Sequence, residues 1–160
     1  MDLGSGDCER AKILVEIGAS SVLAVDKQRY RAMPPGVLPF AAYFDQALAR
    51  IVAFAPEVAY LAWPANNPCR GLREILEVVP VVVYVGSNTR GSSCGVPSLF
   101  RLLRGREVLC HVPDERNTLL VYGATLPEPR ADVYHEELTG LTPGEEPLAY
   151  NGTGKTFMLP

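Results

Sequence analysis

The stretch that decides the fold is residues 1–26, MDLGSGDCERAKILVEIGASSVLAVD. It opens with a tight turn at Gly4, Ser5 and Gly6. Glycine has no Cβ atom, so it adopts positive φ at little cost and lets a ligand approach the backbone closely. The stretch therefore predicts a place where the main chain lies open to a bound molecule.

A helix and a strand are expected after this turn. Asp7 is placed to cap a helix over about 9–17, and Gly18 is placed to end it in the left-handed conformation. The β-rich run 21–25 then delivers Asp26 at its carboxyl end, where a carboxylate is a good partner for the two hydroxyls of a ribose. The order of turn, helix, strand and acid predicts a nucleotide-cofactor site.

Residues 2–8, DLGSGDC, together with the helix and VLAVD, resemble motif I and its acidic partner in class I S-adenosylmethionine-dependent methyltransferases. That family usually shows acid-x-Gly-x-Gly-x-Gly, and here Cys8 stands at the third glycine, which mainly serves close packing of helix on strand. The dinucleotide fingerprint G-x-G-x-x-G does not fit, because the position three after Gly6 is Glu9. The resemblance implies S-adenosylmethionine as cofactor and S-adenosylhomocysteine as product.

The resemblance also implies roles for individual residues. Gly4, Ser5 and Gly6 would approach the methionine part of the cofactor through the backbone. Asp2 and Asp7 would favour its ammonium group, and Asp26 would hold the ribose.

The rest of the chain indicates the same fold class, an α/β protein with a doubly wound, Rossmann-like, mostly parallel sheet and a C-terminal antiparallel hairpin. The expected strands lie at 37–42, 57–63 and 80–86, and the expected helices at 44–54, 71–79 and 97–104. Prolines between 34 and 39 reduce the usual second helix to a loop. The runs 107–112 and 118–123 are joined by PDERN, which makes a hairpin like the one that ends the methyltransferase sheet.

The length of 160 residues and the hydrophobic content of 48% fit one globular core. We expect a methyltransferase-like domain over 1–124 and a Pro-, Gly- and Glu-rich extension over 125–160. Only residues 1–3 precede the turn, so most of the family's first strand is expected to be missing. Exposed strand edges of that kind favour association, with a homo-oligomer as one result.

Two loops are expected to form the substrate pocket, because ligands of open α/β sheets bind beyond the carboxyl ends of the strands. The first follows the strand 57–63 and loosely resembles motif IV of methyltransferases, although a simple proline-asparagine turn explains it equally well. The second is the loop 87–95. The residues predicted to line the pocket are Trp63, Asn66, Asn67, Ser87 and Cys94. Positioning and desolvation supply much of this chemistry, so no catalytic residue is assigned.

Charge and composition narrow the expected partners. The net charge is −3 and the basic residues are dispersed, which predicts a small-molecule substrate and no nucleic acid. No apolar stretch is long enough to span a bilayer and no leader is evident, which predicts a cytoplasmic protein without membrane contact. The four cysteines lack C-x-x-C spacing and the two histidines stand alone, so no metal site is expected.

Two other readings stay open beside methyl transfer to a small molecule. Loss of the first strand favours a non-catalytic binding or structural module that keeps the fold. A serine hydrolase is the third reading, because residues 91–95 match G-x-S-x-G around Ser93, and Asp114 and His135 follow in the order of α/β-hydrolases. That elbow needs a sharp turn between strand and helix, which the polar residues around Ser93 do not provide.

Overall fold

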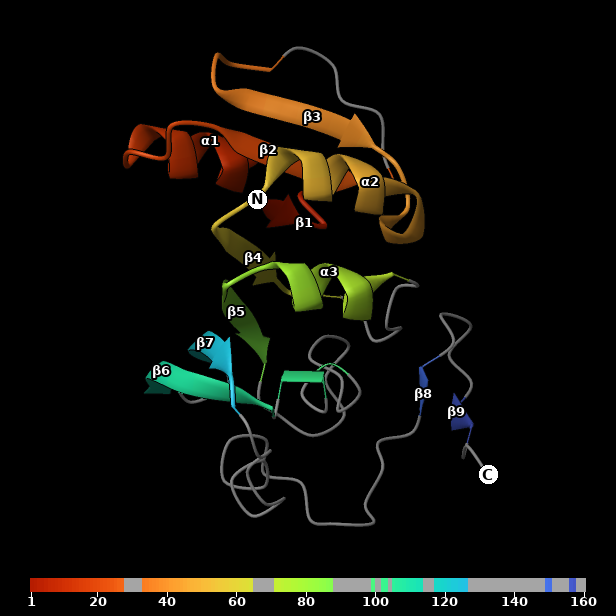
Figure 1. Ribbon diagram of the computed structural model, residues 1–160, viewed down its shortest axis with the longest axis vertical. Coiled ribbons are helices and arrows are strands. Elements are labelled where there is room, and N and C mark those ends of the chain that lie inside the picture. The colour runs from red at the N-terminus through yellow and green to blue at the C-terminus, as the bar shows by residue number, and fades with distance from the viewer. Residues whose placement is uncertain are drawn as a thin grey trace. The chain divides into compact units, whose positions relative to one another are not determined.

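The computed structural model describes residues 1–27, 33–64, 71–87, 99, 102–103, 105–113, 117–126, 149–150 and 156–157. Its contacts divide the chain into two compact units, Met1–Ala62 with Cys69–Val83 and Trp63–Pro68 with Tyr84–Pro160. Seven strands form one mixed sheet in the order β3-β2-β1-β4-β5-β7-β6 (Figure 1). These strands are β1 (Asp2–Leu3), β2 (Val22–Asp26), β3 (Val37–Ala41), β4 (Val58–Ala62), β5 (Val81–Ser87), β6 (Arg106–Pro113) and β7 (Asn117–Thr125).

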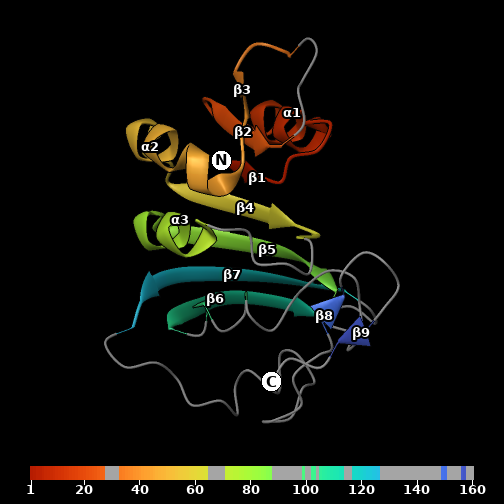
Figure 2. The same cartoon turned by 90° about the vertical axis from the view of Figure 1, so that its right-hand side faces the viewer.

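The first unit is a parallel sheet covered by helices on both faces. Strands β1 to β4 run parallel in the order β3-β2-β1-β4. Helix α1 (Glu9–Glu16) lies on one face, and α2 (Phe44–Phe54) and α3 (Leu72–Val78) lie on the other (Figure 2). The predicted elements of this unit are therefore present to within a residue or two, and the sheet is doubly wound as expected.

The strand β1 is short but takes the central place. Asp2 and Leu3 pair with residues 24–25 of β2 on one side and residues 60–61 of β4 on the other. The backbone N–H of Gly4 continues the pairing with a 2.8 Å bond to the carbonyl of Val25. The first strand is thus as short as expected, yet its two residues are bonded on both sides and join β2 to β4.

Helix α1 ends as expected and begins differently. Gly18 has φ +115, and the N–H groups of Gly18 and Ala19 bond back to Val15 and Leu14 at 3.1 and 3.0 Å. These two hydrogen bonds form a Schellman motif, which satisfies backbone carbonyls at the end of a helix. At the start, Cys8 rather than Asp7 holds the N-cap position, with φ +65. Asp7 instead accepts a 3.3 Å bond from the N–H of Glu9.

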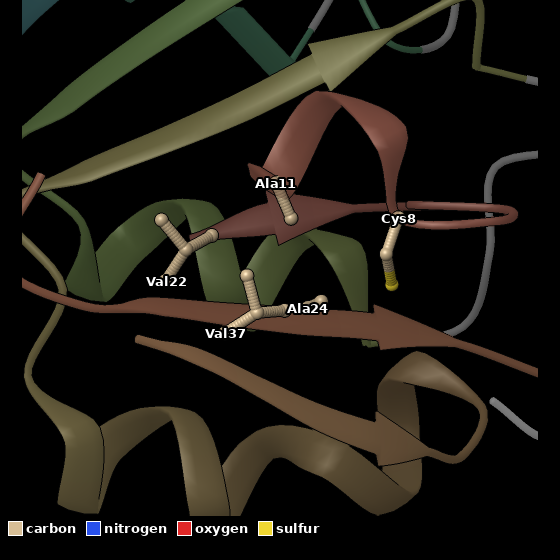
Figure 3. Packing of buried hydrophobic residues seen from close by; sticks show 5 residues of the cluster. All are labelled: Cys8, Ala11, Val22, Ala24 and Val37. Atoms are coloured by element: carbon tan, nitrogen blue, oxygen red, sulfur yellow. The ribbon is translucent and has the colours of Figure 1, made fainter. Parts of the chain in front are cut away.

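Cys8 performs the packing role of the glycine that it replaces. It is fully buried in a cluster between α1 and the sheet, together with small partners (Figure 3). The members of that cluster are Cys8, Ala11, Val22, Ala24 and Val37. Ala11 and Ala24 have small side chains, which leaves space in this cluster for the Cβ and Sγ atoms of Cys8.

The other face of the first unit depends on a close approach of α2 and α3. Gly71, which precedes α3, has φ +84, and a Cβ atom there would lie 2.7 Å from the backbone N and Cα of Asp45. Such a distance is not compatible with any side chain unless the backbone shifts. Gly71 is therefore a packing glycine that brings the starts of the two helices together.

The second unit contains the predicted hairpin. Strands β6 and β7 pair antiparallel, and Arg106 is buried with its Nη1 donating a 2.9 Å bond to the carbonyl of Gly123. Of the expected helix 97–104, the structure describes only residues 99, 102 and 103, which are helical. Residues 149–150 (β8) and 156–157 (β9) form a separate antiparallel pair. None of the helices in the described ranges is both long and apolar enough to cross a bilayer.

Candidate functional site at the glycine turn

The turn between β1 and α1 presents open backbone at two glycines. Gly4 has φ +71 and Gly6 has φ +57, and both values confirm the predicted left-handed conformation. A Cβ atom on either residue would meet no heavy atom within 4 Å beyond its chain neighbours. These two glycines therefore border empty space, which suits the approach of a ligand to the main chain.

Ser5, between the two glycines, anchors the turn from inside. Its N–H shares the carbonyl of Val25 with the N–H of Gly4, at 3.3 and 2.8 Å. Its carbonyl accepts a 2.9 Å hydrogen bond from the N–H of Cys8. Its hydroxyl oxygen accepts a 3.7 Å hydrogen bond from the thiol of Cys8. Since Ser5 is buried, it fixes the shape of the turn from the protein side.

Asp26 lies at the carboxyl end of β2 and reaches the turn directly. Its Oδ2 accepts a 2.9 Å hydrogen bond from the backbone N–H of Gly6. This bond orients the half-buried carboxylate beside the open glycines. The glycine turn and Asp26 thus lie next to each other, as predicted.

Asp2 is the most unusual charged group of the turn. It lies on β1 with its side chain 0% exposed, and in the part of the chain that the structure describes neither Oδ1 nor Oδ2 has a hydrogen-bond partner. Arg10 Nε lies 3.7 Å from Oδ1, close enough for an ion pair but too far for a hydrogen bond. Burial raises the pKa of Asp2, and the positive charge of Arg10 opposes that rise.

Arg10 is the residue of this site that sequence reasoning missed. It lies in the first turn of α1, and its Nη2 donates a 2.7 Å bond to the carbonyl of Gly4. A cation in the first turn is unfavourable to the helix dipole, and that was the available signal. The structure explains the position, because the side chain reaches back over the turn toward Asp2.

The predicted cofactor-binding residues divide into two groups. Asp2, Gly4, Ser5, Gly6 and Asp26 gather at the turn through the contacts given above. Asp7 is exposed, and its Oδ1 contacts the N–H of Glu9.

The predicted pocket residues are less well defined. Trp63 follows β4, is 49% exposed and has φ +51, with its N–H bonded at 2.7 Å to the carbonyl of Val85. Ser87 is the last residue of β5. Asn66, Asn67 and Cys94 lie outside the described residues, as do the hydrolase candidates Ser93, Asp114 and His135.

The residues at the turn fit an adenosyl amino acid. A buried carboxylate without hydrogen bonds suits a cationic group, open glycine backbone suits a closely bound chain, and the acid that ends β2 suits ribose hydroxyls. Within the described ranges, no three His, Cys, Asp or Glu side chains gather as metal ligands.

Comparison with known proteins identifies solved structures with a similar fold. No protein-family model matches the chain, and no curated protein does. A solved structure of an NADB-Rossmann superfamily protein from Streptococcus agalactiae matches with a TM-score of 0.54 and 15% identity, over 84% of this chain and 65% of that one. The fold is Rossmann-like. The expected Rossmann-like fold is confirmed.

Two further matches are crystal structures of the Streptococcus pneumoniae protein Sp1610, a "putative tRNA (m1A22) methyltransferase". Without ligand, it has a TM-score of 0.44 and 17% identity, over 83% of this chain and 67% of that one. With S-adenosyl-L-methionine, the values are 0.46 and 19%, over 83% and 69%. This chain spans about two thirds of the length of the proteins it matches, 65% for the first.

The expected partners need a correction. A small-molecule substrate and the absence of nucleic acid were inferred from a net charge of −3, yet Sp1610 is named for a tRNA substrate. The physical reason is that total charge does not report local charge. A protein that contacts a nucleic acid over a small area needs only a local basic surface.

Proposed function

We propose that this chain binds S-adenosylmethionine at the Gly4–Gly6 turn and supports transfer of its methyl group. The observation that carries the proposal is the 2.9 Å bond between Asp26 and the N–H of Gly6. This bond holds a ribose-binding carboxylate against a backbone turn that is open to a ligand. The two features are far apart in the chain, and the parallel pairing of β1 with β2 brings them together.

Each residue of the site has a distinct task in this proposal. Asp26 accepts hydrogen bonds from the ribose hydroxyls. Gly4 and Gly6 admit the methionine part of the cofactor, and Asp2 attracts its ammonium group. The bound cofactor supplies a methyl group activated by a sulfonium, so the protein contributes mainly by positioning the acceptor and excluding water.

The place of the turn in the sheet supports a ligand site of this kind. The chain runs from β1 through β2 to β3 on one side and then crosses to β4 on the other side of β1. Strand order therefore reverses at β1, and in open α/β sheets ligands bind beyond the carboxyl ends of the strands at this point. Gly4 follows β1 directly.

Calorimetry with S-adenosylmethionine and S-adenosylhomocysteine tests the proposal. We expect both to bind the wild type, and we expect Asp26→Ala to weaken binding about tenfold or more, because hydrogen bonds to a charged group are lost. Glu16→Ala is the matched control, since Glu16 is exposed at the far end of α1. Absence of binding to folded wild type at millimolar ligand would refute the proposal.

Transfer of a labelled methyl group tests the activity separately from binding. The acceptors to be offered include bulk tRNA, because Sp1610 is named as a tRNA methyltransferase. Asp26→Ala should lose any transfer in proportion to its lost cofactor affinity at low cofactor concentration. Binding without transfer to any acceptor would favour the non-catalytic module.

A further inference from the structure

We infer that Asp2 and Arg10 together form a receptor for the α-amino-acid end of the cofactor, with Arg10 as the partner of its carboxylate. The inference rests on the proposed function and adds a residue that the methyltransferase resemblance did not assign. It also specifies the chemistry of the ligand, which must carry an ammonium and a carboxylate on one carbon atom.

Unused hydrogen-bonding capacity is the first observation. Both oxygens of Asp2 and the Nε of Arg10 are buried and have no hydrogen-bond partner among the described residues. A buried polar atom without a partner is energetically unfavourable, and more so when the group is charged. The turn therefore contains two opposite charges, each with capacity for further bonds.

The ion pair between the two side chains does not use up that capacity. At 3.7 Å, Nε and Oδ1 attract one another without a hydrogen bond. A buried ion pair compensates for the loss of water only when additional hydrogen bonds satisfy both partners. A zwitterion complements both charges, because its ammonium is attracted to the buried charge of Asp2 while its carboxylate accepts hydrogen bonds from Arg10.

The position of Arg10 suits a carboxylate. Its bond from Nη2 to the carbonyl of Gly4 holds the guanidinium at the open side of the turn. A guanidinium has five N–H donors in a planar fork that matches a carboxylate. Only that one bond to Gly4 uses a donor within the described part of the chain, and 33% of the side chain is exposed. The donors of Arg10 other than the buried Nε and the one bonded to Gly4 are therefore available to a ligand.

The neighbouring cation Lys12 is differently placed. It bonds to Glu9 Oε1 at 2.5 Å and lies on the surface of α1. The bond to Glu9 raises the pKa of Lys12, so it stays charged but is already paired. Lys12 therefore serves as a matched control, with the same charge on the same helix two residues away.

The buried carboxylate of Asp2 favours an amino-acid cofactor over a dinucleotide. In dinucleotide-binding folds a pyrophosphate lies at the start of the first helix. Here a buried carboxylate, Asp2, lies under that turn and would repel a phosphate. NAD is therefore the informative negative ligand for this chain.

The test compares ligands with and without the carboxylate. S-adenosylhomocysteine and its decarboxylated analogue S-adenosyl-3-thiopropylamine are titrated by calorimetry into wild type, Arg10→Gln, Arg10→Lys and Lys12→Gln. We expect the wild type to prefer S-adenosylhomocysteine by about tenfold or more, and Arg10→Gln to abolish that preference while binding the analogue within about twofold of wild type. Arg10→Lys should retain part of the preference, and Lys12→Gln all of it. We expect no NAD binding at millimolar concentration.

The outcomes separate this inference from the proposed function. If the wild type binds S-adenosylhomocysteine but not more tightly than the decarboxylated analogue, the inference is wrong and the proposed function stands. Equal weakening of both ligands by Arg10→Gln leads to the same conclusion. If the wild type binds neither, both are wrong.

Folding of the variants is controlled with a double substitution. Removing Arg10 alone leaves the buried charge of Asp2 uncompensated, and such variants are often unstable. Asp2→Asn combined with Arg10→Gln removes both charges and should fold. It should bind S-adenosylhomocysteine weakly and without preference for the carboxylate, whereas a retained preference would contradict the inference.

Discussion

Two glycines of the first unit precede helices with positive φ and differ in their surroundings. Gly6 precedes α1 and Gly71 precedes α3, with φ +57 and +84. A Cβ atom at Gly71 would lie 2.7 Å from the backbone of Asp45, whereas one at Gly6 would meet nothing within 4 Å. Gly71 is therefore required by packing, whereas Gly6 borders space that a ligand can occupy.

This difference shows why glycine alone does not mark a ligand site. Left-handed φ explains both residues equally well, since either would be strained with a side chain. Gly6 and Gly71 differ only in the atoms that a Cβ atom at each position would meet. Substitution of each glycine by alanine should therefore damage a different property of the protein.

The largest expected effect is on the folding of Gly71→Ala. Its Cβ atom forces the starts of α2 and α3 apart and is strained at positive φ, so the free energy of unfolding should fall by about 3 kcal/mol. Urea unfolding followed by circular dichroism measures this change. A loss below about 1 kcal/mol would show that the two helices do not pack as described. Affinity for S-adenosylhomocysteine should be unchanged in the folded fraction.

The next effect is on ligand binding by Gly6→Ala. Its Cβ atom has room in the protein, so stability should fall by only about 1–2 kcal/mol, from the positive φ. The added methyl group occupies the ligand's space, and the dissociation constant for S-adenosylhomocysteine should rise about tenfold or more. Gly18→Ala is the matched control, because Gly18 also has positive φ and open surroundings but lies at the other end of α1.

Gly6→Ala and Gly18→Ala thus form a pair that differs in one property. Both should lose stability, and only the first should lose affinity. Equal affinity of the two variants would show that the turn does not face the ligand.

The smallest expected effect is on the pH dependence of stability at the first turn. Burial raises the pKa of Asp2 above its usual value of 3.8, so the folded chain keeps the proton to a higher pH than the unfolded chain. The free energy of unfolding therefore falls as pH rises from 3.8 through the folded pKa. Asp2→Asn cannot ionise, so its stability relative to wild type should increase over that window and then level off.

Urea unfolding of both proteins between pH 4 and 7 measures this difference. A relative stability of Asp2→Asn that falls with rising pH would mean that Arg10 stabilises the carboxylate more than burial destabilises it. Arg10→Gln should enlarge the effect, because it removes the charge that opposes the rise in the pKa of Asp2.

Local patterns predicted the elements of this fold well. Gly18 ends α1 in the expected conformation, Asp26 stands at the end of β2, and the two runs around PDERN form the hairpin of β6 and β7. These features depend on residues close together in the chain. The sequence was therefore sufficient for them.

The features that it did not predict depend on contacts between distant residues. The central place of β1 requires bonds to β2 and β4, which the length of the segment did not suggest. The close approach of Gly71 to Asp45 joins two helices. Arg10 was missed because its contacts with Asp2 and Gly4 cross the turn.

The site was predicted in part for the same reason. Asp2 and Asp7 had the same expected role, and the fold separates them, with Asp2 buried on a strand and Asp7 exposed on a loop. The sequence indicated that carboxylates would stand at the turn. It did not indicate which of the two carboxylates is buried, and burial decides the chemistry of a carboxylate.

The most direct test of the ligand site is an amide NMR titration of the isotope-labelled chain with S-adenosylhomocysteine. We predict that the amide signals of Gly4 and Gly6 shift most, together with that of Asp26, whereas the signal of Gly71 stays in place. Shifts at Gly71 or elsewhere with Gly4 and Gly6 unmoved, or no shifts at millimolar ligand, would contradict the assignment of the Gly4–Gly6 turn as the cofactor site.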